Sequence, residues 1–143
     1  LMPIAREAHI RILTKETLDG LVNESQSDYR GRLLERERSI LLRYEDGPEG
    51  EEGPASTSIH IREGQVEIVR GGSVSNRLIY IPGEWTSCHY QTPMGILDLR
   101  VFTERFQFLK LSDRKMRLIL SYQLELNGQE AGRRELSIEI VMR

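Results

Sequence analysis

The sequence of 143 residues predicts an all-β domain whose sheet is antiparallel and has eight to ten strands. Three observations predict it. Apolar and polar residues alternate with period two along most of the chain. Glycine and proline fall between the alternating runs. These turn signals recur about every 8 to 12 residues, the spacing of hairpins rather than of strands joined through helices. With 38% hydrophobic and 29% charged residues, the composition suits one globular domain over residues 1–143.

Alternating runs follow one another after a short N-terminal extension, which we expect at residues 1–6. The longest run covers residues 116–126, where apolar side chains stand two positions apart with mostly polar residues between them. Turn residues separate neighbouring runs, as at Gly71-Gly72 and Asn127-Gly128. One face of each strand is therefore expected to be buried. The other runs lie at His9–Leu13, Ile59–Ile61, Val66–Ile68, Leu78–Tyr80, Leu97–Val101 and Leu136–Ile140.

Residues 33–44 fit two different structures. Leu33, Glu37, Leu41 and Tyr44 have helical spacing, and the segment Leu-Leu-Glu-Arg-Glu-Arg is rich in good helix formers. The alternative is a pair of strands, about 25–34 and 39–45, that turn near residues 35–38 and place Ile40, Leu42 and Tyr44 on one face. Local propensity does not separate the two.

Residues 46–54 read Asp-Gly-Pro-Glu-Gly-Glu-Glu-Gly-Pro. This segment is acidic, rich in glycine and proline, and has no apolar side chain to bury. We expect a mobile loop there.

Charge and hydropathy argue against two classes of partner. The 20 Lys and Arg nearly cancel the 22 Asp and Glu, which leaves a net charge of -2 and no global field for nucleic acid or an anionic membrane. The one dense basic stretch, residues 30–38, is interrupted by Glu35 and Glu37. No apolar run approaches the roughly 18 residues of a membrane-spanning helix, and the N-terminus lacks the apolar segment of a signal peptide. We expect a cytoplasmic protein without nucleic-acid or membrane partners.

Metal binding and catalysis find little support in the sequence. Cys88 is the single cysteine, so it forms no internal disulfide and no thiolate metal site by itself. Cys88 and His89 are adjacent, and on a strand they point to opposite faces. His9, His60 and His89 lack the short spacing of a helix-borne zinc pair. We predict no metal and no cofactor. An enzyme ranks last, because no set of acid, base and nucleophile is recognisable.

Several motifs occur in a characteristic order. They are Tyr90-Gln91-Thr92-Pro93-Met94-Gly95, then Leu120-x-Tyr122-x-Leu124-x-Leu126-Asn127-Gly128-Gln129, then Leu136-x-Ile138. In these motifs the sequence resembles the YwiB-like family of small uncharacterised bacterial proteins, from about Ala8 to Ile140. The resemblance implies a closed β-barrel of the calycin type, similar in shape to lipocalins, and it implies strand pairing across residues 33–44. It implies no activity.

A closed barrel suggests where a ligand would bind. Closure removes the exposed strand edges, and a barrel of about eight strands can hold one small ligand. Arg70 continues the inward-facing positions of Val66 and Ile68, so its guanidinium is a candidate anchor for an anion. Alternatively, Arg70 reaches solvent from the end of its strand and the tyrosines only fill space. Hydroxyl groups for the same site would come from Tyr44, Tyr90, Thr92 and Tyr122.

The function that fits best is non-catalytic binding of a small amphipathic or anionic molecule inside the barrel. The alternative is a filled barrel that acts as a protein-interaction module, with a protein partner or as a homodimer. Trp85 is the only tryptophan, and it would either plug one end of the barrel or anchor a partner.

Overall fold

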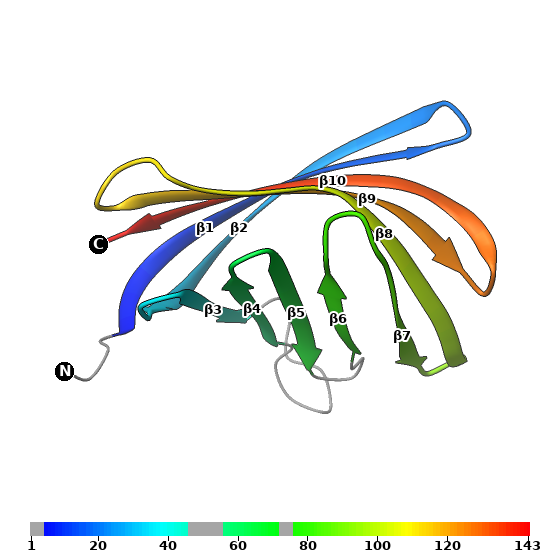
Figure 1. The fold of residues 1–143 in the computed structure, drawn as a ribbon, viewed down its shortest axis with the longest axis horizontal. Helices are drawn as coiled ribbons and strands as arrows, with labels where there is room; N and C mark the ends of the chain where they lie inside the picture. The colour runs from blue at the N-terminus through cyan, green and yellow to red at the C-terminus, as the bar shows by residue number, and fades with distance from the viewer. Residues whose placement is uncertain (1–4, 46–55, 72–75) are drawn as a thin grey trace.

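The computed structural model describes residues 5–45, 56–71 and 76–143, and the strands in these residues form one sheet (Figure 1). The expected loop at 46–54 lies outside the described residues. The expected extension at 1–6 is wrong for its last two residues, because Ala5 and Arg6 already pair with Leu34 and Leu33. The strands are β1 (Ala5–Leu18), β2 (Leu21–Glu35), β3 (Ser39–Glu45), β4 (Ser56–Arg62), β5 (Gln65–Gly71), β6 (Asn76–Tyr80), β7 (Trp85–Thr92), β8 (Gly95–Lys110), β9 (Lys115–Leu126) and β10 (Gln129–Met142).

All ladders in the sheet are antiparallel, and the strand order is β6-β5-β4-β3-β2-β1-β10-β9-β8-β7. The sheet curls round until β6 comes beside β7, which gives a nearly closed barrel (Figure 1). The predicted all-β barrel is thereby confirmed. In the described residues no backbone ladder joins β6 to β7. The hydroxyl of Thr86 on β7 instead donates to the carbonyl of Ile79 on β6, over 2.5 Å.

The ambiguous segment is a hairpin of two strands. Leu33 of β2 pairs with Leu42 of β3, and both side chains are fully buried. Ile40 and Tyr44 share that inward face, as the two-strand alternative requires. A helix would have placed only part of this apolar set against the core. Burial of the whole alternating face therefore outweighs the helix propensity of the segment.

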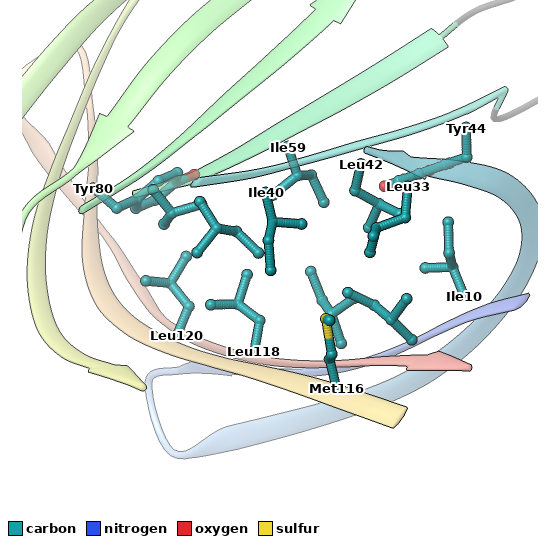
Figure 2. Close-up of a cluster of buried hydrophobic side chains, with 14 of the residues drawn as sticks. Ile10, Leu33, Ile40, Leu42, Tyr44, Ile59, Tyr80, Met116, Leu118 and Leu120 are labelled. Atoms are coloured by element: carbon teal, nitrogen blue, oxygen red, sulfur yellow. The ribbon is translucent and has the colours of Figure 1, made fainter. Parts of the chain in front are cut away.

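The core fills one half of the barrel, toward the turns after β2, β4 and β8. Side chains from opposite walls meet there, with Leu118 and Leu120 of β9 facing the strands of the other wall (Figure 2). Each of these leucines is almost completely excluded from solvent. The fully buried members of this core are Ile10, Leu33, Leu42, Ile59, Val66, Val101, Met116, Leu118, Leu120, Ile138, Ile140 and Met142.

Gly31 allows β1, β2 and β3 to pack closely. A Cβ atom at this position would lie 2.4 Å from the carbonyl oxygen of Arg43 and 2.7 Å from Cδ1 of Ile10. Real Cβ atoms do not approach so closely, so a side chain here would push β3 or the core apart.

Two β-bulges curve the other wall of the barrel. The register shifts between Thr103 and Arg105 in β8 and between Glu130 and Arg133 in β10. Bulges increase local twist and redirect the neighbouring side chains. Beyond the bulge in β10, the inward positions run through Arg134, Leu136 and Ile138.

Across the described ranges the structure has no helix with the length and hydropathy needed to cross a bilayer.

Candidate functional site

The other half of the barrel encloses a cavity of about 480 Å³. It lies toward the hairpin turns Leu18–Leu21 and Thr92–Gly95, and its wall is formed by inward-facing residues of all ten strands. Leucine and isoleucine side chains line the part next to the core, among them Ile12, Leu99 and Leu136. Hydroxyl groups, two arginines, Asn76, Glu16 and further leucines line the rest. The cavity thus combines an apolar inner end with a mixed outer wall that carries two cations and one carboxylate.

Four of the five residues predicted for the site line this cavity. They are Tyr44 on β3, Arg70 on β5, Tyr90 on β7 and Tyr122 on β9. Thr92, the fifth, is not among the residues that line it. Its hydroxyl donates to the carbonyl of Gly95 over 2.9 Å and accepts from the amide of Met94 over 3.2 Å, so Thr92 stabilises the β7–β8 turn.

Arg70 lies near the end of β5, where its strand partners are Thr57 and Asn76. All three residues line the cavity, and Arg70 itself is exposed. Its side chain therefore borders both the cavity and the solvent. This is the position at which a guanidinium remains hydrated and still reaches an anion entering the barrel.

Four tyrosines of the cavity wall form two ring pairs. Tyr29 and Tyr44 stack with their ring centroids 4.7 Å apart, and Tyr80 and Tyr122 are tilted with their centroids 4.9 Å apart. Burial raises the pKa of the Tyr80 phenol well above its ordinary value, and the neighbouring Tyr122 raises it further. Tyr80 is therefore a neutral hydroxyl group at the bottom of the polar part of the cavity.

Arg134 is the main residue of this site that the sequence analysis missed. It projects from β10 into the cavity, and its Nη2 donates to Oε1 of Glu16 over 2.7 Å. Burial acts to lower the pKa of Arg134, but Tyr122 and the Glu16 carboxylate outweigh burial and raise that pKa above its ordinary value. Its Nε is buried and has no acceptor in the described part of the chain. The alternation Arg134, Leu136, Ile138 was the signal that could have revealed it.

The histidines and Trp85 lie away from the cavity. His9 contacts Asp28 at 3.0 Å and His89 contacts Asp98 at 2.6 Å, both on the outer face. His60 lies beside Arg62, and its pKa is lowered by partial burial and by that cation. Trp85 packs on Phe102 and under the guanidinium of Arg100, so it does not plug the barrel. Within the described residues, no group of three His, Cys, Asp or Glu side chains could hold a metal ion.

Cys88 packs partly buried against the core beside the backbone of Arg77. Burial raises the pKa of its thiol, which disfavours the reactive thiolate. The position and the direction of the pKa shift are those of a cysteine that packs against the core rather than of a nucleophile.

Comparisons with known proteins agree with the fold. A family described as a domain of unknown function, DUF1934, matches residues 10–138. An uncharacterised β-barrel protein of Bacillus subtilis strain 168, YwiB, is 23% identical over 127 residues, which are 87% of this chain and 87% of YwiB. The crystal structure of YwiB from Bacillus subtilis superposes with a TM-score of 0.83 at 20% identity, over 97% of this chain and 93% of that one. These matches bear out the resemblance drawn from the motifs.

Proposed function

Because the chain belongs to the DUF1934 family, for which no function is described, we propose its function from the cavity: non-catalytic binding of a small anionic molecule with an apolar body. The observation that carries this proposal is the buried Nε of Arg134, a hydrogen-bond donor in a cavity wall with no acceptor in the described residues. A buried donor without a partner costs free energy. A carboxylate, sulfonate or phosphate oxygen would supply the acceptor and the opposite charge together.

The shape and polarity of the cavity support the same ligand class. A volume of about 480 Å³ lies within the range of small-molecule sites. The apolar body of the ligand would contact Ile12, Leu99 and Leu136, while its acidic group meets Arg134. Arg70 would attract the anion at the mouth. The mode of binding would resemble that of lipocalins.

Catalysis is not part of the proposal. Among the described residues that line the cavity, Glu16 is the one carboxylate, and it is engaged by Arg134; histidine and cysteine are absent from that wall. A binding role requires no proton transfer or nucleophile, so the wall as it stands is sufficient for it.

The test is native mass spectrometry of the protein purified from its own host, as wild type, Arg134→Gln and Arg70→Ala, with the exposed Arg114→Gln as the matched control. We expect a bound small molecule in the wild type and the control, weaker retention in Arg70→Ala and loss in Arg134→Gln. In a second assay, titration with anilinonaphthalene sulfonate should give saturable fluorescence with the same order of variants. Apo masses throughout, together with no saturable probe binding, would refute the proposal.

A protein-interaction role is the second candidate, and exposed apolar side chains favour it. Leu21 is 77% exposed at the β1–β2 turn, and Met94 is 95% and Ile96 63% exposed at the β7–β8 turn. Both turns lie on the right of the molecule in Figure 1, the β1–β2 turn at the top and the β7–β8 turn at the bottom. Paired replacement of Leu21 and Met94 by serine, followed by measurement of the mass in solution and of partner capture, tests this role separately from Arg134.

A further inference from the structure

A cluster of arginines lies on the outer face of β2 and β3, on the opposite side of the sheet from the cavity. Arg30 and Arg32 stand two residues apart on β2, so both point outward, and Arg43 of β3 pairs in register with Arg32. All three are exposed, and they line a depression of about 470 Å³. Like charges directly opposite each other on neighbouring strands destabilise a sheet. The arrangement therefore lowers the stability of the sheet, and an anion bound between the arginines would relieve their repulsion.

The carboxylates of the described residues do not neutralise the cluster. Within the described residues, none of the three arginines forms an ion pair, although Glu7 and Glu45 line the same depression. The nearest cation to Glu7 is Arg143, at 4.0 Å, and Arg143 also lines the depression. The depression thus holds more arginines than carboxylates.

The backbone fixes this juxtaposition. Gly31 lies between Arg30 and Arg32, and the close approach of its Cα to the carbonyl of Arg43 draws β2 and β3 together at this point. The guanidinium groups consequently start from one compact part of the sheet rather than from distant loops.

We propose that this depression, formed by Arg30, Arg32 and Arg43, binds the phosphoryl group of a small phosphomonoester. A carboxylate has two oxygens and one charge, which suit a single guanidinium fork. A phosphoryl dianion has three oxygens and can accept from adjacent guanidinium groups at once, which also cancels their mutual repulsion. A phosphorylated side chain of another protein would present the same group.

Nucleic acid fits this surface less well. A continuous phosphate backbone would pass Glu7 and Glu45, which repel it. No Phe, Tyr or Trp lines the depression in the described structure, and its one imidazole, that of His9, contacts Asp28, so unpaired bases would find few rings to stack on. This proposal does not depend on the ligand proposed for the barrel, because the arginines lie on the outer face of the sheet and the cavity on its inner face.

The experiment is a titration of the folded protein with inorganic phosphate, followed by amide chemical shifts in nuclear magnetic resonance at constant ionic strength with chloride. We expect saturable shifts centred on Arg30, Arg32 and Arg43. The double variant Arg32→Gln with Arg43→Gln should weaken binding about tenfold or more, and the double lysine variant should bind with intermediate affinity, because lysine keeps the charge but loses the fork. Arg114→Gln is the control for a general loss of one positive charge.

Titrations with further ligands identify the kind of molecule that carries the phosphoryl group. Phosphoserine as the free amino acid and a phosphoserine peptide should shift the same amides, and tighter binding of the peptide would assign the group to a protein partner. Linear shifts without saturation, equal binding by the double glutamine variant, or binding of an oligonucleotide without binding of phosphate would overturn the proposal. Because all three arginines are exposed, thermal unfolding should show that the variants remain folded.

Discussion

Arg134 and Glu16 face each other across β10 and β1 in register, with Nη2 of the arginine 2.7 Å from Oε1 of the glutamate. Both side chains are partly exposed, at 36% and 48%, so the ion pair adds little to stability. In the proposed binding role, an anionic ligand would compete with Glu16 for the same guanidinium.

The first prediction concerns this competition. Glu16→Gln should change the free energy of unfolding by less than about 1 kcal/mol, since a half-exposed ion pair contributes no more. It should strengthen binding of anilinonaphthalene sulfonate, because the guanidinium of Arg134 then no longer has to give up its ion pair with the Glu16 carboxylate. Fluorescence titration measures the affinity. The matched control is Glu135→Gln, one residue further along β10 and on its outer face. Equal or weaker binding by Glu16→Gln would contradict the competition.

A second prediction follows from the raised pKa of Tyr80. Because burial raises that pKa above the ordinary value of 10.0, the native state retains the phenol proton more tightly than the unfolded chain does. The resulting stability is fully present below about pH 10 and is lost as pH rises from there through the higher native pKa. Tyr80→Phe should remove this part of the alkaline decline. Urea unfolding at a series of pH values from 7 to about 11 measures it.

Tyr90→Phe is the control for the loss of a hydroxyl group from the cavity wall. An alkaline stability profile of Tyr80→Phe identical to that of the wild type would show that Tyr80 does not contribute.

Gly31 gives a third prediction. Gly31→Ala should destabilise the protein by about 3 kcal/mol, because the new methyl group would lie 2.4 Å from the carbonyl of Arg43 and overpack against Ile10. Gly71→Ala is the matched control, since among the described residues a Cβ there meets only Ser56 Oγ at 3.6 Å, and its effect should stay below about 1 kcal/mol. Chemical denaturation of both variants provides the comparison. Similar stability of the two variants would contradict the close approach of β2 and β3.

Alternation along the chain was sufficient to predict most of the fold. The even-numbered positions of β9 from Met116 to Tyr122 are buried, as the period-two pattern requires. Residues 33–44 were not decided by local propensity, because the pairing of Leu33 with Leu42 depends on burial against distant strands. Local propensity does not depend on contacts with distant strands, so it cannot predict that burial.

The candidate site could be predicted only in part, for a similar reason. Arg70 was found because Val66 and Ile68 mark the inward-facing positions of β5 and the register of this strand is unbroken up to Gly71. Arg134 follows a bulge, and bulges change which residues face inward. The alternation of β10 before the bulge therefore does not predict that Arg134 points into the barrel. Thr92 was expected to supply a hydroxyl group to the site, but in the structure it uses that hydroxyl within the β7–β8 turn.

The final prediction concerns the gap between β6 and β7. Thr86 bridges these strands through its hydroxyl, which donates to the carbonyl of Ile79, where a continuous barrel would have backbone hydrogen bonds. Thr86→Val keeps the size and β-branching of the side chain and removes the donor, which leaves a partly buried carbonyl without this partner. Amide hydrogen exchange should therefore accelerate in β6 and β7, while the paired amides of β1 and β10 keep the wild-type rate. Thr86→Ser retains the donor and should restore most of the protection. Acceleration spread evenly over all ten strands would mean global destabilisation, and unchanged exchange in β6 and β7 would mean that Thr86 does not hold the gap closed.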